Sequence, residues 1–169
     1  MDEKKTFAQD TESRFLKAKS DALRLLSFKP RSVEELRGRL RLKKYGSEVI
    51  ENVIESLKRQ GILNDEKFAK LFANSRVYTR PAGRRQLEFD LKRKGLSKEL
   101  VATTLGDLKD VDEKKMARDL VFTRFQKMSD VPEKKRKARL FGFLRRRGFQ
   151  NDTIFAVMRE LFRDTDEES

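Results

Sequence analysis

A pattern of apolar residues recurs three times along this chain, and it constrains the fold more than any other feature. Two leucines four residues apart, Leu36 and Leu40, recur as Leu87 and Leu91 and again as Leu140 and Leu144. The residues that follow these pairs recur too: Lys44 and Tyr45, Gly95 and Leu96, and Gly148 and Phe149. A second apolar set keeps the same register: Ile50, Val53, Ile54 and Leu57; Val101, Thr104, Leu105 and Leu108; Ile154, Val157, Met158 and Leu161. Recurrence at a period of roughly 50 residues indicates tandem copies of one supersecondary unit.

Each copy is predicted to contain three helices. The first helix of each copy shows the three- and four-residue spacing of apolar residues that is typical of a helix. These residues are Ala22, Leu23 and Leu26; Phe68, Ala69 and Phe72; and Met116, Ala117, Leu120 and Val121. A proline follows each of these segments (Pro30, Pro81 and Pro132), and proline disfavours helix at and before its own position.

Polar residues mark the expected helix ends. Ser32 and Glu35 have the spacing of a capping box. The second helices are predicted to end at Lys44, Gly95 and Gly148, of which the glycines suit a left-handed closing residue better than the lysine. Caps are expected near Ser47, Ser97 and Asn151 for the third helices, and at Asn64 and Asp65 for the first helix of the second copy.

These signals predict an all-α protein made of three tandem three-helix repeats that form an elongated, curved body. Charged residues make up 41% of the 169 residues and apolar residues only 37%, which is too polar for one thick core. The expected parts are an N-terminal extension with the start of the first helix (1–20), repeat 1 (21–63), repeat 2 (64–109), repeat 3 (110–162) and an acidic tail (163–169).

Composition excludes several kinds of chemistry. The chain has neither Cys nor His, so thiolate zinc sites and Ser-His-Asp or Cys-His catalysis are impossible within it. We therefore expect no enzymatic activity and no cofactor. The charged N-terminus leads into no apolar run, and no stretch approaches a membrane span, so we expect a cytoplasmic protein without a membrane partner.

Positive charge is concentrated in the second helix of each copy. The chain has 41 Lys and Arg against 28 Asp and Glu, a formal charge of +13 that favours polyanionic partners. The candidate binding residues are Arg37, Arg39, Arg41, Lys43 and Lys44; Arg84, Arg85, Lys92, Arg93 and Lys94; and Lys134, Lys135, Arg136, Lys137, Arg139, Arg145, Arg146 and Arg147. In the second copy Glu88 and Asp90 dilute the charge. Three such clusters on a repeating scaffold are expected to form a basic stripe that neutralises phosphates with little sequence preference.

Four aromatic residues lie near these clusters. Tyr45 and Phe149 could stack on bases, but Leu96 at the equivalent position favours a packing role. Of Phe141 and Phe143, one is expected to face the core and the other to be exposed or to touch a partner.

A helix-turn-helix reader of specific sequences is less well supported than non-specific contact. In that motif the helix after the turn enters the major groove, and here that helix carries Glu48, Glu51 and Glu55 in the first copy. Asp65 and Glu66 are better explained as acids at a helix start than as metal ligands.

Several ordered segments resemble the RecX family of RecA regulators. They are 30–36 (PRSVEEL), 61–69 (GILNDEKFA), 83–87 (GRRQL), 91–96 (LKRKGL) and 144–149 (LRRRGF), and the match covers about residues 20–162. Lys44 stands where many members have Gly, and Asn64 where Asp is usual. The resemblance implies a monomer of tandem three-helix repeats that binds the RecA nucleoprotein filament in its groove. It further implies inhibition of the RecA ATPase and of strand exchange in DNA repair, recombination and the SOS response, with weak, non-specific binding to single- and double-stranded DNA and no catalytic residues.

Two other classes stay open. A stand-alone, non-specific DNA-binding or architectural protein would bind duplex tightly without RecA. A metal-dependent nuclease would need carboxylates that converge on one pocket, whereas the acids of this chain are scattered or lie at helix caps.

Overall fold

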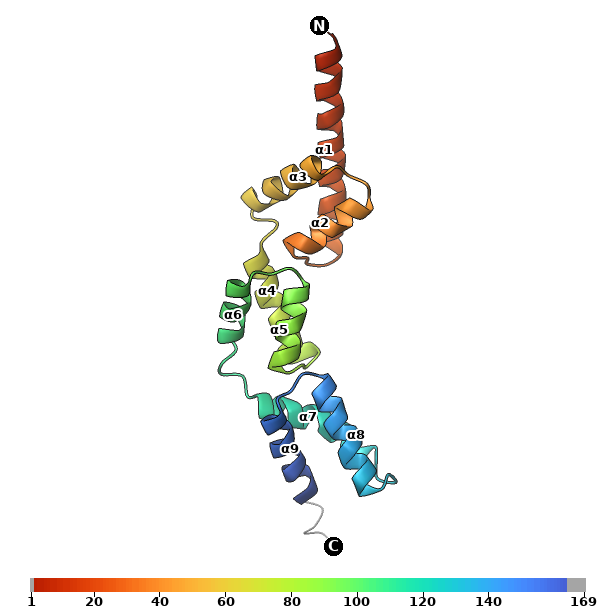
Figure 1. The fold of residues 1–169 in the computed structure, drawn as a ribbon, viewed down its shortest axis with the longest axis vertical. Helices are drawn as coiled ribbons and strands as arrows, with labels where there is room; N and C mark the ends of the chain where they lie inside the picture. Colours follow the sequence, from red (N-terminus) through yellow and green to blue (C-terminus); the bar gives the residue numbers. More distant parts are fainter. Residues whose placement is uncertain (1, 164–169) are drawn as a thin grey trace. The chain divides into compact units, whose positions relative to one another are not determined.

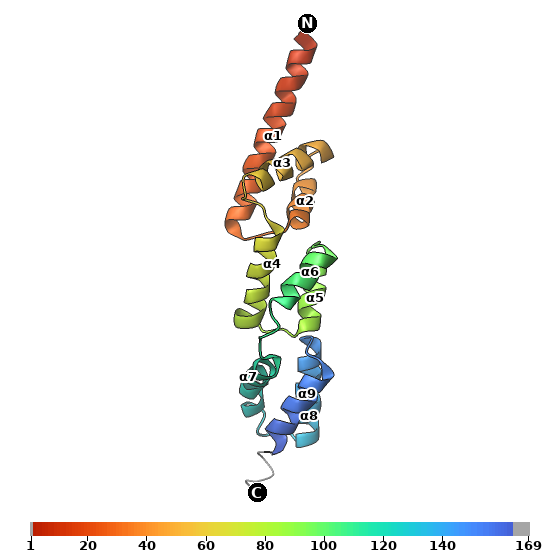
Figure 2. The same cartoon turned by 90° about the vertical axis from the view of Figure 1, so that its left-hand side faces the viewer.

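The computed structural model describes residues 2–163, and the side chains of residues 11–163. Within this part of the chain there are helices but no strands, which confirms the all-α prediction (Figures 1 and 2). The helices are α1 (Asp2–Phe28), α2 (Val33–Leu42), α3 (Ser47–Arg59), α4 (Asp65–Asn74), the π-helix η1 (Ser75–Thr79), α5 (Arg84–Arg93), α6 (Lys98–Gly106), α7 (Glu113–Gln126), α8 (Glu133–Arg146) and α9 (Asn151–Arg163). The predicted acidic tail lies, after Arg163, outside the described residues.

The chain divides into two compact units. Unit 1 comprises Met1–Lys70 and Arg93–Leu100, and unit 2 comprises Leu71–Lys92 and Val101–Ser169. The elongated, curved body that the sequence suggests stays a prediction.

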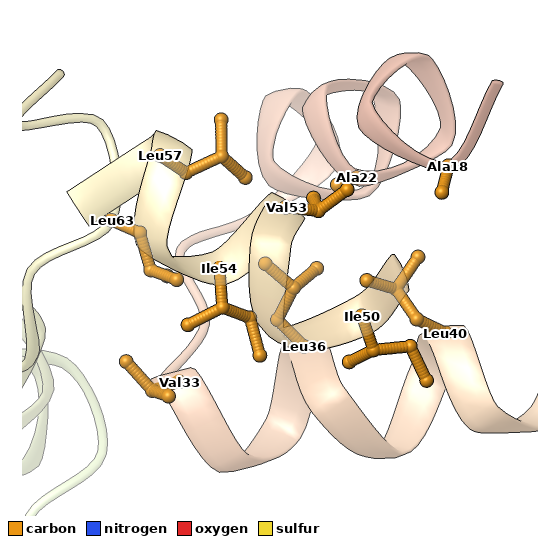
Figure 3. Packing of buried hydrophobic residues seen from close by; sticks show 10 residues of the cluster. All are labelled: Ala18, Ala22, Val33, Leu36, Leu40, Ile50, Val53, Ile54, Leu57 and Leu63. Atoms are coloured by element: carbon orange, nitrogen blue, oxygen red, sulfur yellow. The ribbon is translucent and has the colours of Figure 1, made fainter. Parts of the chain in front are cut away.

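Helices α1, α2 and α3 surround the core of unit 1 (Figure 3). Leu36 and Leu40 of α2 point toward Ile50, Val53 and the rest of the buried face of α3. Two small residues of α1, Ala18 and Ala22, let that helix pack closely against the group. The remaining side chains of the cluster are Val33, Ile54, Leu57 and Leu63. Of the apolar residues that indicated this helix, Ala22 is buried and Leu26 packs on the core together with Leu25, whereas Leu23 is exposed.

Helices α7, α8 and α9 form the equivalent core in unit 2. Leu140 and Leu144 of α8 are fully buried, as are Ile154 and Val157 of α9 and Val121 of α7. Phe149, Leu161, Phe162 and Ala117 complete the cluster.

Burial recurs at equivalent positions of all three copies and confirms the repeat. The six leucines that define the second helices are all buried. In the third helices, Ile50, Val101 and Ile154 are buried, as are Val53, Thr104 and Val157 at the next equivalent position. A shared burial pattern at a fixed offset is the property expected of tandem copies of one unit.

The second helices end in the same way in each copy. Gly95 and Gly148 have a φ of 79°, and Lys44 has a φ of 64°, which is the only positive φ of a non-glycine residue within the described part of the chain. All three therefore close their helices in the left-handed conformation, as predicted, although lysine adopts it with strain.

The helices begin at or next to the predicted residues, and three of the predicted caps are confirmed, whereas Asp65 is the first residue of α4 rather than its cap. Ser32 forms the capping box with Glu35, while Asn64 and Ser97 accept hydrogen bonds from the backbone N–H three residues on. Ser47 and Asn151 are instead the first helical residues, preceded by Gly46 and Gln150, whose carbonyls accept the first helical hydrogen bonds. Boundaries of this kind shift easily because any residue can supply that carbonyl.

Candidate basic binding surface

Within unit 2, the end of α8 meets the start of α5. The backbone N–H of Gly83 donates to the carbonyl of Arg147 (2.8 Å), and that of Arg85 donates to the carbonyl of Gly148 (3.3 Å). The carbonyls at the end of one helix thus satisfy donors at the start of another, groups that would otherwise lack partners. The Arg147 guanidinium closes the joint by donating to the carbonyl of Pro81 (3.1 Å).

The same joint recurs within unit 1, where the end of α5 meets the start of α2. Ser32, which is fully buried, donates its hydroxyl to the carbonyl of Lys94 (2.6 Å), and the Lys94 ammonium pairs with Glu35. A Cβ on Gly95 would overlap Glu34, just as a Cβ on Gly148 would overlap Gln86. The glycines are therefore required both by their φ and by the close approach of the neighbouring helix.

The α8–α5 joint brings together five arginines, which we call the junction cluster: Arg84, Arg85, Arg145, Arg146 and Arg147. Two of them have structural partners, because Arg84 donates to the carbonyl of Leu105 (3.1 Å) and Arg147 lies over the ring of Phe143. The side chains of Arg85, Arg145 and Arg146 are exposed and pair with no other described residue. One acid is close by, since Glu113 accepts from the backbone N–H of Arg84 (3.2 Å).

The remaining predicted cations of α8 also divide into unpaired residues and residues that have a structural partner. Lys134, Lys135 and Arg139 are exposed and unpaired within the described chain. Lys137 pairs with Glu133, and Arg136 stacks over Phe125 and Phe162 with its guanidinium carbon 4.7 Å and 5.5 Å from the two ring centres. Arg136 and Arg147 therefore serve packing as well as charge.

The predicted cations of α2 are mostly engaged by acids. Arg37 binds Glu34 (2.5 Å) and Glu51 of α3 (2.7 Å), and Arg41 lies 3.8 Å from Glu34. The hydrogen bond from Arg37 holds the pKa of Glu51 below its usual value. No acid lies between these cations in the sequence, yet Glu34 of the same helix and Glu51 of the next helix reach them in the structure.

Lys43 is also engaged, since its ammonium lies 3.1 Å from Asp21 of α1, which also accepts from the Tyr45 hydroxyl (2.9 Å). These hydrogen bonds from Lys43 and Tyr45 hold the pKa of Asp21 below its usual value. Of the five predicted residues in this copy, only Arg39 and Lys44 are exposed without a partner in the described chain.

In α5, Lys92 pairs with Glu88 (2.5 Å), and Arg93 is exposed but has an interaction partner of its own. Asp90, which the sequence suggested would dilute the basic surface, does not do so. It is 1% exposed and accepts from Arg76 of η1 (2.6 Å) and from Gln86 (3.0 Å). A buried carboxylate that is fully hydrogen-bonded is a structural element, here tying α5 to the π-helix that precedes it.

The aromatic residues near the clusters mainly serve packing. Phe149 is 1% exposed, and Tyr45 is half-buried, so the packing role is confirmed for both. Phe141 and Phe143 both pack against the core of repeat 3 and are both half-buried, so the division into one buried and one exposed ring was wrong.

Taken together, unpaired cations gather on α8 and at the start of α5, a surface suited to phosphates or to an acidic protein face. A continuous positive track over all three copies stays a prediction. The carboxylates of the described residues form no group of three or more able to hold a metal ion. Within residues 2–163, no helix combines the length and apolarity needed to cross a membrane.

Three family models match consecutive parts of the chain: "RecX, first three-helix domain" at residues 18–57, "RecX, second three-helix domain" at 64–105 and "RecX, third three-helix domain" at 112–158. "Regulatory protein RecX" of Amycolatopsis mediterranei is 37% identical over 158 residues, which cover 94% of this chain and 90% of the relative. The protein of the same name from Chlorobium limicola is 35% identical over 141 residues, 83% of this chain and 87% of the relative.

Solved structures share the fold. The crystal structure of RecX from Lactobacillus salivarius superposes with a TM-score of 0.73 at 21% identity, covering 89% of this chain and 97% of that one. A second crystal structure of regulatory protein RecX gives a TM-score of 0.80 at 22% identity, covering 93% and 79%. With three consecutive domain models matched and relatives above 30% identity over most of its length, this chain belongs to the RecX family of regulatory proteins.

Proposed function

We propose that this chain is a regulator, chiefly an inhibitor, of the RecA recombinase, and that it acts by binding the RecA–DNA filament in its groove. Membership of the RecX family supports the regulatory role. The observation that carries the proposal for this chain is the set of exposed, unpaired cations on α8 and α5: Arg85, Lys134, Lys135, Arg139, Arg145 and Arg146.

Those cations supply the attraction to the filament. Like charges held together on one helix repel one another, and a polyanionic partner relieves that repulsion. If about five phosphates are neutralised, the logarithm of the binding constant falls with the logarithm of salt concentration with a slope of about −4 to −5 on duplex.

Tandem repeats add a second effect. Repeats that touch neighbouring RecA protomers at the same time strengthen one another through effective concentration, so individually weak contacts suffice. Occupying the groove hinders the second DNA strand and favours protomer arrangements that hydrolyse ATP poorly, which is how binding becomes modulation of ATPase, strand exchange and filament stability.

The decisive variant is Arg145→Glu combined with Arg146→Glu. Arg147 is left intact because it also holds the α8–α5 joint. The measurement is inhibition of DNA-dependent ATP hydrolysis by the cognate RecA, across salt concentrations. We expect at least a tenfold rise in the concentration needed for half-inhibition, since two attractive charges become repulsive.

The control is Lys67→Glu combined with Lys70→Glu, two exposed cations of α4 outside the predicted clusters. It changes the net charge equally and should leave inhibition within twofold. Inhibition by the α8 variant at the wild-type concentration would remove this surface from the RecA site. Tight duplex binding at physiological salt together with no effect on RecA would favour the alternative, a stand-alone DNA-binding protein.

A further inference from the structure

An aromatic pair lies at the surface of repeat 3, on helices α8 and α9. The ring centres of Phe141 and Phe155 are 5.4 Å apart and the rings are tilted by 47°. Phe155 is 53% exposed, although its neighbours Ile154 and Val157 are fully buried. In another close pair of this repeat, Phe162 belongs to the buried core cluster and Phe125 packs against it. A large ring that stays in solvent does not gain the free energy of burial. An exposed aromatic pair is therefore a candidate contact surface for a partner.

Cations flank the pair at helical spacing. Lys134 lies seven residues before Phe141 and Arg145 four residues after it, so the three share one face of α8. On α9, Arg159 lies four residues after Phe155. All three cations are exposed and make no ion pair with another described residue.

The acids of α9 do not cancel this charge. Glu160 is bound by Lys114 (3.1 Å) and Arg118 (3.3 Å) of α7. Asp152, three residues before Phe155 in the first turn of α9, is an exposed acid that offsets one charge, so the three cations still leave this face net positive. We call Phe141, Phe155, Lys134, Arg145 and Arg159 the aromatic face.

We propose that the aromatic face binds single-stranded DNA, with an unpaired base stacked on Phe155 and the backbone phosphates held by the flanking Lys and Arg residues. Exposed rings among cations are the combination by which proteins hold unpaired strands without sequence preference. A duplex offers the same phosphates but keeps the faces of its bases stacked on one another. An apolar protein partner is a poorer match, because it would bury three unpaired cations without compensation.

This proposal rests on the proposed function only because both use helix α8. It adds that this helix contacts DNA in the single-stranded state. The first test is Phe155→Leu, which keeps an apolar side chain of similar size and removes the ring. Binding is followed by fluorescence anisotropy of a labelled oligothymidylate and of a duplex of equal length. We expect the single strand to bind about fivefold to tenfold more weakly, which corresponds to the loss of about one stacked base. Binding of the duplex should not change.

Phe122→Leu is the matched control. Phe122 is 49% exposed on α7 of the same repeat, but the cation one turn before it, Arg118, is engaged with Glu160. It should bind both nucleic acids as the wild type does. A nearly equal loss in both phenylalanine variants would show a general effect of surface apolarity and would overturn the proposal.

A direct reporter is available because the chain contains no Trp. In Phe155→Trp the single indole should be quenched when oligothymidylate saturates the protein, and binding should be retained, since indole stacks at least as well as phenyl. Unchanged fluorescence at saturation would mean that the strand binds elsewhere. A Phe155→Leu variant that binds oligothymidylate normally but has lost RecA inhibition would identify the face as a protein-docking surface, which also refutes the proposal.

The two proposals fail separately. If the Arg145 and Arg146 reversals leave RecA inhibition intact while Phe155→Leu still weakens oligothymidylate binding, the RecA site is refuted and the single-strand site stands. The reverse result leaves the RecA site and removes the stacking site.

Discussion

Repeats 1 and 3 are built on the same plan and handle their positive charge in opposite ways. Both bury a pair of leucines four residues apart on the second helix against an apolar face of the third. In repeat 1, acids from α1, α2 and α3 bind Arg37, Arg41 and Lys43. In repeat 3, Lys134, Lys135, Arg139, Arg145 and Arg146 have no such partners in the described chain.

The comparison separates what the fold needs from what binding needs. Arginines that pair within the repeat contribute to its stability and have little charge left for a partner. Unpaired arginines contribute repulsion to the folded state and keep their full charge for a polyanion. Substitutions at equivalent positions of the two repeats should therefore affect different properties.

The largest effect is expected at the closing residue of the second helix. Gly148→Ala should lower the free energy of unfolding of the protein by about 2–4 kcal/mol, because a Cβ is strained at a φ of 79° and would overlap Gln86 of α5. Chemical denaturation of the variant and the wild type measures this difference in the free energy of unfolding.

Lys44→Gly, at the equivalent position of repeat 1, should act in the opposite direction. It relieves the left-handed strain of a lysine with a φ of 64° and should stabilise the protein by up to about 1 kcal/mol. Gly38→Ala in α2, where a Cβ meets nothing, controls for the general effect of adding a methyl group. Equal responses of Gly148→Ala and Gly38→Ala would contradict the account of the joint.

The next effect concerns the two kinds of arginine. Arg37→Glu should lower the free energy of unfolding by about 1–2 kcal/mol and less at high salt, because it replaces two ion pairs with repulsion from Glu34 and Glu51. Arg139→Glu, on the second helix of repeat 3, should change it by less than about 0.5 kcal/mol, since that side chain is exposed and unpaired.

The effects of these two substitutions on RecA inhibition should be the reverse of their effects on stability. Arg139→Glu is expected to weaken inhibition of RecA, and Arg37→Glu to leave it unchanged as long as the protein stays folded. Circular dichroism measures whether each variant is folded. The rate of ATP hydrolysis by RecA measures the inhibition. The comparison fails if both variants lose the same property.

The sequence predicted the repeat and its buried positions because both depend on local periodicity. The leucines, the prolines and the left-handed closing residues recur at fixed offsets, and each has a local physical cause. Even Lys44 was correctly placed, because the repeat assigns it the role that glycine has in the other copies.

Partners across helices could not be predicted in this way. Glu51 is 14 residues from Arg37, and Asp21 is 22 residues from Lys43, so nothing local in the sequence joins them. Asp90 was taken for a surface acid for the same reason, since Arg76 binds it from a π-helix that no pattern indicated. The exposure of Phe155 could have been predicted from the sequence, because this residue lies out of phase with the buried Ile154 and Val157 of a strongly amphipathic helix.

The smallest expected effect distinguishes the acids of the two repeats by pH and salt. Asp21 is hydrogen-bonded by Lys43 and Tyr45, and Glu160 of repeat 3 is bound by Lys114 and Arg118; both groups have a pKa below their usual values for these reasons. A carboxylate with a lowered pKa stabilises the folded state above the pKa of the unfolded chain, near 4, and loses that contribution as the pH falls through its own lower value. Stability should thus decline less steeply below about pH 4 in Asp21→Asn and in Glu160→Gln than in the wild type.

Salt should then separate the two carboxylates. The Glu160 side chain is 36% exposed and its partners are both charged, so its contribution should largely disappear at 0.5 M salt, where the screening length is roughly 4 Å. The Asp21 side chain is 18% exposed and one of its two donors is the neutral Tyr45 hydroxyl, a hydrogen bond that salt screens little. The pH dependence due to Asp21 should therefore persist at high salt. Parallel loss in both variants would mean that the acids of repeat 1 act only as surface charges, as those of repeat 3 do.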